Sequence, residues 1–332
     1  MKELQRGGHE IKFLENYAWQ EPSTLSTSSW LKCYASWSLN HKRLIIRYLL
    51  QDFDCDLVYS EKIEPTTLAY LLSKKMAIPF VIDSHDLERV NLLDKYINSI
   101  ITSYLIKKAA KVFTISKELH KLYQNIRKDV IYLPSTADLG FFDPRKLGQV
   151  DKFNEITFIW CGNMKGSDFC ELILQAFRKL NGEKLYLVGD GPKRQFYEKL
   201  TSELGLNKKV IFTGWVSDKE LARLYKASDI GLLPFNDDLW NRCKAPSKLF
   251  EFMAMEIPFV CTVGEPAYMV EKLGCGLVAK PEVFDFSKKM AYAVKNLNEL
   301  KDKAKEARKY LLEKQNFGVL AKKLEEELQS LV

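Results

Sequence analysis

The sequence predicts an α/β protein made of two doubly wound domains in tandem. Short β-rich runs alternate with longer segments of helical periodicity along the chain, which is the pattern of parallel sheets covered by helices. A length of 332 residues suits two domains of ordinary size, and an apolar content of 46% is enough for two cores. Residues 142–154 contain Pro144, Gly148 and mixed charges without periodicity. We therefore expect a first domain at 1–147 and a second at 148–332.

In the first half, apolar and β-branched runs predict parallel strands, and one apolar-periodic segment predicts a helix over 68–76. The strands are expected at 11–14, 57–60, 79–83, 111–115 and 130–134. The segment from Leu25 to Trp37 is rich in Ser and Trp and has no clear period, so we expect a surface loop there.

In the second half, the same alternation continues more regularly. Strands are expected at 156–160, 184–188, 210–212, 230–233 and 258–261. Helices are expected at 169–180, 194–204 and 218–227, from Pro246 onward, and through the charged tail 284–332. Ligands of such sheets bind at the carboxyl ends of the strands.

Composition limits the class of protein. The net charge of +7 is compatible with anionic ligands or an anionic membrane surface, but no nucleic-acid motif is present. Seven scattered cysteines without a CxxC pair indicate a reducing cytoplasm. The polar N-terminus lacks the features of a secretory signal, and no apolar window is long enough to span a membrane. The basic, apolar segment 41–50 predicts either peripheral contact with an inner-membrane surface or an ordinary domain helix.

One carboxylate, Glu251, lies inside the apolar helical run 249–254. A buried carboxylate without a partner is costly, so such a residue is usually exposed, paired or functional. Pro246 suits the first turn of this helix, whose free N–H groups favour an anion. Lys248 lies in the same turn, where a shared anion would offset the unfavourable helix dipole. The alternative is a buried helix whose single Glu reaches the surface.

Several strands of the second half end in glycine. After the first of them, Gly162 allows backbone N–H groups to approach a phosphate and Lys165 adds a cation. An ordinary strand-to-helix turn is the alternative. At 189–192, we expect the glycines to permit a tight turn and Asp190 to accept from local N–H groups.

Two further turns end in glycine. Gly214 marks a close approach of the backbone, and Gly264 precedes Glu265, a carboxylate placed to meet a polar ligand. None of these turns is a Walker loop or a G-x-G-x-x-G fingerprint.

Taken together, residues 156–278 resemble the nucleotide-binding domain of retaining GT-B glycosyltransferases, the large family 4 group. The first half resembles the family's acceptor domain through the segments 83–86, 114–117 and 133–135. The resembling segments of the second half are 162–166, 188–192, 210–214, 225–230, 246–254, 258–260 and 274–278.

This resemblance implies a GT-B fold, with two Rossmann-like domains facing a central cleft and a last helix that crosses back to the first domain. It implies that Glu251 holds the ribose of the donor and that Lys165 and Lys248 neutralise the departing diphosphate. Gly264 and Glu265 would face the donor sugar. The nucleotide site would further include Gly162, Asn163 and Gly214. His85 would lie near the sugar carbon under attack, and no metal or other cofactor is expected.

Three departures from the family pattern stand out. The first Glu of the family's E-x7-E motif falls at Cys243, for which Asp237 or Asp238 is a candidate substitute. Asn163 replaces the usual arginine, and Arg242 or Lys244 is a candidate replacement for that cation. The chain also lacks the expected opening strand and glycine-rich loop, which suggests either truncation or a differently built acceptor site.

The resemblance implies a retaining, metal-independent hexosyltransferase of polysaccharide biosynthesis. It would use a UDP- or GDP-sugar and a hydroxyl of a glycan or lipid-linked acceptor, in the cytoplasm and with peripheral membrane contact. The departures keep a catalytically silent nucleotide-sugar-binding subunit open. A GT-B epimerase or phosphorylase is a second alternative, and a nucleic-acid binder a distant one.

Overall fold

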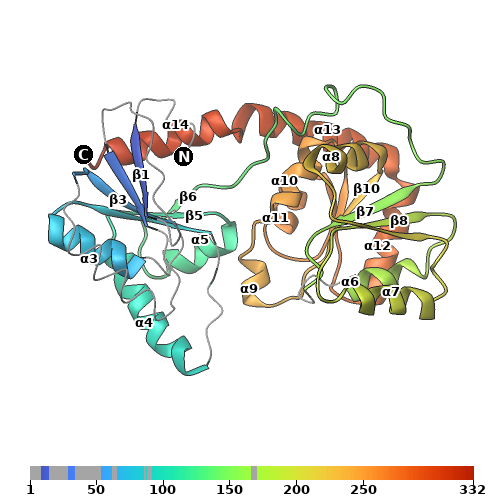
Figure 1. Cartoon of the computed structure of the whole chain (residues 1–332), viewed down its shortest axis with the longest axis horizontal. Coiled ribbons are helices and arrows are strands. Elements are labelled where there is room, and N and C mark those ends of the chain that lie inside the picture. Colours follow the sequence, from blue (N-terminus) through green and yellow to red (C-terminus); the bar gives the residue numbers. More distant parts are fainter. Residues whose placement is uncertain are drawn as a thin grey trace. The chain divides into compact units, whose positions relative to one another are not determined.

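The computed structural model describes residues 9–14, 29–33, 54–61, 66–85, 87, 92–165 and 170–332. The chain divides into two compact units. The first comprises residues 1–134 together with 317–332, and the second comprises residues 135–316. Each unit has its own parallel sheet (Figure 1).

The first unit has a six-stranded sheet whose strands follow one another in chain order. They are β1 (Glu10–Leu14), β2 (Ser29–Cys33), β3 (Leu57–Glu61), β4 (Phe80–Ser84), β5 (Lys111–Thr114) and β6 (Ile131–Tyr132). The loop expected over 25–37 is wrong for its central part, because β2 pairs in parallel with both β1 and β3. Ser, Lys and Cys dilute the β-rich pattern of this strand, so its pairing with two neighbours decides its conformation.

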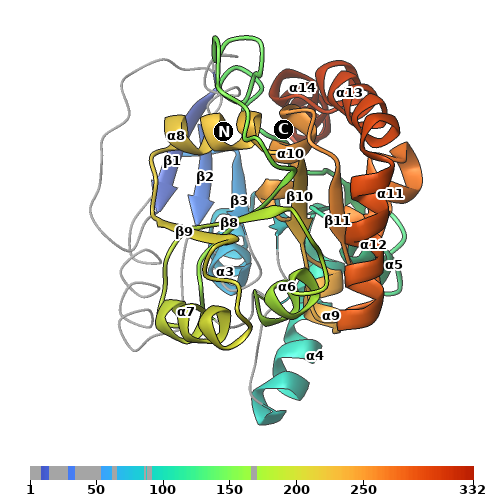
Figure 2. The ribbon, with the colours of Figure 1, turned by 90° about the vertical axis from the view of Figure 1, so that its right-hand side faces the viewer.

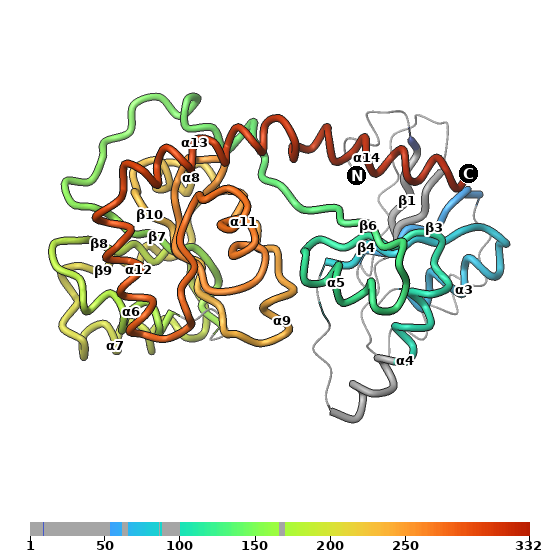
Figure 3. Tube along the Cα trace, turned by 180° about the vertical axis from the view of Figure 1, so that it is seen from behind, coloured from blue at the N-terminus to red at the C-terminus, as the bar shows by residue number. Residues whose placement is uncertain are grey.

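Among the described residues of this unit, the helices are α3 (Thr66–Met76), α4 (Leu92–Lys108), α5 (Lys117–Gln124) and the C-terminal α14 (Phe317–Gln329). The chain of α14 returns to the first unit (Figure 3). Its Leu324 and Leu328 pack against Leu57 and Tyr59 of β3 and against neighbouring strands. Ion pairs add to this apolar contact: Glu325 meets His9 at 2.7 Å and Glu327 meets Lys111 at 2.7 Å. The end of the chain thus completes the core of the first unit.

The second unit has strands in the order β9-β8-β7-β10-β11-β12, all parallel. They are β7 (Thr157–Cys161), β8 (Lys184–Val188), β9 (Val210–Gly214), β10 (Ile230–Leu233), β11 (Phe259–Cys261) and β12 (Gly276–Val278). This is the doubly wound Rossmann order, in which the chain reverses direction across the sheet between its first and fourth strands. The reversal lies between β7 and β10.

Helices cover both faces of this sheet (Figure 2). One face packs against α6 (Cys170–Phe177), α7 (Arg194–Glu203) and α12 (Val283–Lys295). The other packs against α8 (Asp218–Ala227), α10 (Ser247–Ala254), α11 (Glu265–Leu273) and α13 (Leu297–Lys314). A short helix, α9 (Leu239–Arg242), follows β10. The strands β7, β8 and β10 are apolar on both sides because both of their faces are buried.

The boundary between the units lies earlier than the sequence indicated, after Pro134 rather than after residue 147. Ala137, Leu139, Phe142 and Leu147 pack into the core formed by α8, α10 and α13. Four spaced apolar residues therefore bind an otherwise irregular segment to the second unit, whereas its Pro, Gly and charged residues indicated a linker.

The predicted α/β class with two parallel sheets is confirmed. The reversal of strand order lies in the second unit, whereas the described strands of the first unit follow chain order. The segment 41–50, Gly166 and the first eight residues lie outside the described residues. Among the helices of the described part, none combines the length and the apolar character needed to cross a membrane.

Candidate functional site

Two glycine turns of the second unit, after β7 and β8, pack directly against each other. Gly162 donates its N–H to the Val188 carbonyl at 3.0 Å. Gly189 has φ +122°, and a Cβ there would lie 2.0 Å from the Gly162 carbonyl oxygen. Gly191 would place a Cβ 2.7 Å from the Asn163 side chain. Only glycine permits this approach of two backbones.

The third glycine turn joins the same group. Gly189 donates its N–H to the Gly214 carbonyl at 2.9 Å, which links the ends of β8 and β9. Asp190 accepts from the Gly191 N–H at 2.7 Å and from Arg194 at 3.1 Å. The expected structural part of Asp190 is confirmed, and Lys165 and Asn163 project as exposed side chains from the β7 turn beside it.

Glu251 lies in the middle of α10 and is 8% exposed. It has a buried partner, because the Tyr225 hydroxyl of α8 donates to its Oε2 at 2.8 Å. The Cys161 thiol at the end of β7 lies close enough to Tyr225 for each group to shift the pKa of the other. Lys248, half-buried one helical turn before Glu251, is close enough to act electrostatically on the same thiol. This group (Cys161, Tyr225, Lys248 and Glu251) lies where the strand order reverses, the usual place for a ligand in such sheets.

Two of the four side chains in this group, a carboxylate and an ammonium group, have the chemistry to bind a polar ligand. Burial raises the pKa of Tyr225 well above 10.0, and the neighbouring Cys161 and Glu251 raise it further. Burial likewise raises the pKa of Cys161, an effect that the positive charge of Lys248 opposes. Both groups are therefore protonated at neutral pH, so Tyr225 acts as a donor. The second oxygen of Glu251 and the ammonium group of Lys248 are the polar groups suited to a ligand.

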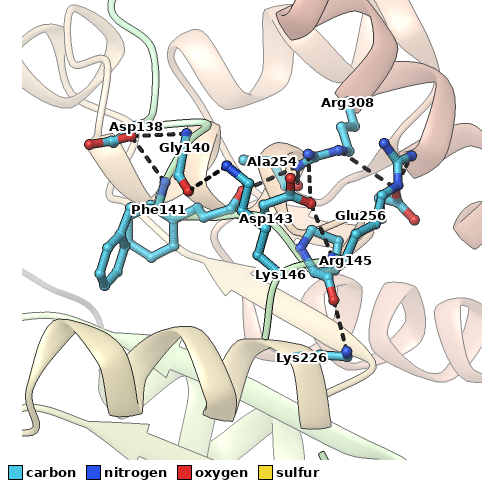
Figure 4. Close-up of polar contacts among 12 residues, drawn as sticks. Asp138, Gly140, Phe141, Asp143, Arg145, Lys146, Lys226, Ala254, Glu256 and Arg308 are labelled. Carbon is cyan, nitrogen blue, oxygen red and sulfur yellow. Dashed lines mark hydrogen bonds and ion pairs between the residues drawn. The ribbon is translucent and has the colours of Figure 1, made fainter. Parts of the chain in front are cut away.

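The helix that carries Glu251 and Lys248 is held at its other end by Arg308 of α13 (Figure 4). Arg308 is 2% exposed and donates to the carbonyls of Ala254 and Phe142. Its guanidinium pairs with Asp143 at 2.9 Å and lies 3.7 Å from Glu256. Burial lowers the pKa of Arg308 and Asp143 opposes that effect. One cation thus joins the end of α10, α13 and the segment after residue 135.

The turn before α11 is equally constrained. Gly264 has φ +80°, and a Cβ would approach the carbonyl oxygens of Asn241, Arg242 and Lys244 to between 2.8 and 3.3 Å. Glu265, expected to meet a ligand, is only 1% exposed, and its N–H donates to the Lys244 carbonyl at 3.3 Å. The tight packing that requires glycine here also encloses the carboxylate that follows.

The residues suggested to replace the missing glutamate have other partners. Cys243 itself is buried at the end of α9. Asp238 caps that helix through both carboxylate oxygens, each at 2.8 Å from Asn241. Asp237 pairs with Arg242 at 2.5 Å. No candidate for the first Glu is thus without a partner.

The suggested replacement cations are also engaged. Arg242 is the partner of Asp237, and the ammonium nitrogen of Lys244 lies 3.2 Å from the centre of the Trp240 ring. A cation over an indole face is attracted by the ring electrons, so Lys244 has a local structural contact. Both suggested replacement cations therefore already have side-chain partners of their own.

His85 belongs to the first unit and follows β4 directly. Its Nε2 lies 3.1 Å from Asp83 Oδ2 and its Nδ1 lies 3.3 Å from Glu61 Oε1. Tyr59 donates to the same Asp83 oxygen at 2.5 Å. The histidine is half-buried between two carboxylates at the ends of β3 and β4, an arrangement that fixes the direction of its ring.

Sequence reasoning missed the parts that Tyr225 and Cys161 play. The motif 225–230 was included in the resemblance, but nothing in it links Tyr225 to a carboxylate 26 positions later. Within the described ranges, no group of three or more His, Cys, Asp or Glu side chains has an arrangement that could hold a metal ion.

Residues 155–299 match the family of glycosyl transferases group 1. The match includes every residue of the group around Glu251 and all of the glycine turns. Over these residues the chain is similar to glycosyl transferases group 1.

Curated relatives agree over shorter segments. An uncharacterized glycosyltransferase of Methanocaldococcus jannaschii is 31% identical over 93 residues, which is 27% of this chain and 23% of that protein. The lipopolysaccharide core biosynthesis glycosyltransferase LpsD of Rhizobium meliloti is 49% identical over 43 residues, or 13% of this chain and 12% of LpsD. The chain thus aligns with less than a quarter of either relative.

Among solved structures, HepE of Anabaena in complex with UDP has the same fold, with a TM-score of 0.73 at 17% identity. The similarity covers 91% of this chain and 92% of HepE. The predicted GT-B class with two Rossmann-like domains is therefore confirmed.

Proposed function

We propose that the protein is a retaining glycosyltransferase that moves a hexose-type sugar from a nucleotide diphosphate donor to a hydroxyl of a glycan or lipid-linked acceptor. One observation carries the proposal. A carboxylate and a lysine of α10, Glu251 and Lys248, lie beside the reversal of strand order in a domain that matches glycosyl transferases group 1. The Rossmann rule makes this the expected position of a nucleotide.

On the donor side, Glu251 would accept hydrogen bonds from the ribose hydroxyls through the oxygen that Tyr225 leaves available. Gly162, Asn163 and Gly214 would border the nucleotide, since the glycine turns let backbone N–H groups approach it closely. Gly264 would present its backbone toward the donor sugar. Burial of Glu265 supports a structural contribution for this residue, so its contact with the sugar depends on a rearrangement of the turn.

The departing diphosphate gains negative charge as the bond to the sugar breaks. Lys248 and Lys165 would stabilise that charge, Lys248 from the first turn of α10 and Lys165 from the turn after β7. Stabilisation of developing charge by prepositioned groups is commonly the largest contribution to catalysis. We include no metal in this scheme, since two lysines suffice as cations for the leaving group.

In the first unit, His85 would lie near the sugar carbon under attack, with its ring oriented by Asp83 and Glu61. The acceptor hydroxyl would attack from the face of the leaving group, with retention. The name of LpsD supports a saccharide acceptor of the lipopolysaccharide type, and UDP in HepE supports a UDP-sugar over a GDP-sugar. We place the reaction in the cytoplasm, at or near the inner-membrane surface.

Thermal unfolding with UDP, GDP, ADP and CMP tests the donor site. A nucleotide at about 100 times its dissociation constant stabilises the folded state by roughly 2.7 kcal/mol. We expect a rise in melting temperature of about 5–10 °C for one of them. Glu251→Ala should weaken that nucleotide's binding. Unchanged affinity in this variant would reject the role of Glu251, and no shift with any nucleotide would reject the proposed donor class.

A second candidate function is a catalytically silent subunit that binds a nucleotide sugar for a partner enzyme. The burial of Cys243 and the engagement of Asp237 and Asp238 favour it, because the sugar-binding carboxylate of the family pattern then has no substitute. Turnover separates the two functions. An enzyme releases nucleotide diphosphate from the donor that stabilises it, whereas a silent subunit binds that donor and releases none.

A further inference from the structure

The first unit carries an exposed surface of apolar, aromatic and basic side chains on α3 and α4. We name it the α3–α4 surface. It consists of Leu71, Lys74, Lys75, Ile100, Ile101, Tyr104, Lys107 and Lys108. The two helices are neighbours in the first unit (Figure 1). They are joined by Tyr70 and Tyr104, whose hydroxyls are 3.0 Å apart and whose rings meet edge to face.

The apolar part of this surface is unusually open. Ile100 is 59% exposed and Tyr104 is 46% exposed, while Leu71 and Ile101 are each 36% exposed. On α4, Ile100, Tyr104 and Lys107 recur at helical spacing and so project in one direction. On α3, Leu71, Lys74 and Lys75 do the same. Single exposed apolar residues are common, but adjacent ones on two packed helices mark a surface with a partner.

The charged part has one sign. Four lysines border the apolar residues, and neither α3 nor residues 100–108 contain an aspartate or a glutamate. Lysines at the end of a helix also complement its dipole, which accounts for their position in the last turns. The dipole does not account for the isoleucines and the tyrosine beside them. Cationic side chains beside exposed aliphatic and aromatic ones complement an anionic surface with an apolar interior.

We propose that the α3–α4 surface docks the protein on an anionic lipid membrane, with Ile100, Ile101 and Tyr104 entering the headgroup region and the lysines meeting the lipid phosphates. Tyrosine prefers the membrane–water interface, and the lysine stems extend along apolar surface while their charges stay in water. This interaction is independent of nucleotide binding and of sugar transfer. Aliphatic side chains at the centre favour lipid over nucleic acid, which is bound through basic grooves and stacked aromatic residues.

Sedimentation of the full-length protein with vesicles tests this surface. We expect binding to vesicles that contain about a third phosphatidylglycerol and none to pure phosphatidylcholine. Each lysine near an anionic leaflet contributes about a fivefold gain in affinity, so Lys107→Glu/Lys108→Glu should weaken partitioning more than tenfold. Ile100→Ser/Tyr104→Ser should weaken it at unchanged charge. Raising the salt concentration to about 0.5 M should weaken wild-type binding, because phosphate contacts at the surface are screened.

The matched control is Lys288→Glu/Lys309→Glu, which changes the net charge equally but alters the second unit. It should bind anionic vesicles like the wild type. Equal loss in this control would overturn the proposal, since attraction would then follow net charge alone. Failure of the wild type to bind anionic vesicles would also overturn it. A third outcome would overturn it as well: the protein binds no vesicles, and the α4 substitutions instead dissociate a dimer or a nucleic-acid complex. Far-UV circular dichroism and melting temperature establish that each variant is folded.

Discussion

The hydroxyl of Tyr225 donates to the carboxylate of Glu251 at 2.8 Å, inside the core between α8 and α10. This bond explains how a carboxylate can lie in an apolar helix without leaving the fold unstable. The bond gives one carboxylate oxygen of Glu251 a hydrogen-bond donor and fixes the orientation of the other. A residue that sequence alone marks as anomalous is therefore built into the core and oriented from a neighbouring helix.

The first prediction concerns this bond. Tyr225→Phe keeps the ring and removes the donor, so Glu251 loses its orientation and keeps an unsatisfied buried oxygen. We expect a loss of about 1–3 kcal/mol in the free energy of unfolding and nucleotide binding roughly fivefold weaker. Urea unfolding and isothermal titration measure the two. Tyr123→Phe is the matched control, because it removes a buried hydroxyl bonded to Ser84 in the first unit. Tyr123→Phe should reduce stability and leave nucleotide affinity unchanged. If Tyr225→Phe and Tyr123→Phe bind the nucleotide with equal affinity, Tyr225 does not position Glu251 for binding.

The second prediction concerns Lys248, whose charge is proposed to act on the leaving group. Because that charge develops in the transition state, Lys248→Ala should lower kcat by about 100-fold and change nucleotide affinity much less. Steady-state kinetics with the donor and titration with the free nucleotide separate these effects. Lys288→Ala, an exposed lysine of α12, should behave like the wild type. Losses of equal size in kcat and in affinity would argue against late electrostatic stabilisation.

The third prediction concerns the buried cation that holds α10. Arg308→Ala leaves Asp143 and two backbone carbonyls without their partner. Breaking such a buried pair costs about 3–5 kcal/mol, so the melting temperature should fall by roughly 10 °C. Arg178→Ala, at an exposed position of the same unit, should change stability by less than about 0.5 kcal/mol. Thermal unfolding of both variants tests this prediction. Similar melting temperatures for the two would show that the contacts of Arg308 contribute little to stability.

The fourth prediction is an alkaline loss of stability. Burial raises the pKa of the Cys275 thiol from 9.0 to about 12. Above pH 9 the unfolded chain loses this proton while the folded chain retains it, so the unfolded state is favoured as pH rises toward 12. The contribution is fully present below pH 9. Cys275→Ala should therefore reduce the slope of unfolding free energy against pH by up to about 1.4 kcal/mol per pH unit between these values.

Urea unfolding from pH 8 to pH 11 measures that slope. Met290→Ala serves as the control, because Met290 is a fully buried sulfur side chain that does not titrate. It should lower stability by a constant amount at every pH. A slope in Cys275→Ala equal to that of the wild type would mean that the thiol ionises alike in both states.

Most strands and helices could be predicted from the local pattern of apolar and polar residues. The strands β7, β8 and β10 were predictable because buried parallel strands are continuous apolar runs. The helix α10 was predictable because Pro246 directly precedes an apolar run of helical periodicity. The strand β2 was not predictable, since its sequence shows no apolar alternation and its neighbours in the sheet determine its pairing. The boundary between the two units could not be located from the sequence for a similar reason. The apolar residues of 135–147 are too widely spaced to indicate which core they join.

For the candidate site, the sequence by itself determined which residues carry unusual chemistry: a carboxylate and a lysine in an apolar helix, and glycines at the ends of successive strands. These signals are local, because burial cost and backbone conformation depend on the residue and its near neighbours. Only the tertiary structure decided their partners. Tyr225 reaches Glu251 from α8, Arg308 reaches α10 from α13, and the turns after β7 and β8 meet backbone to backbone. Such pairings depend on how segments far apart in the chain pack against each other, and the local pattern of a single sequence does not show which segments will meet.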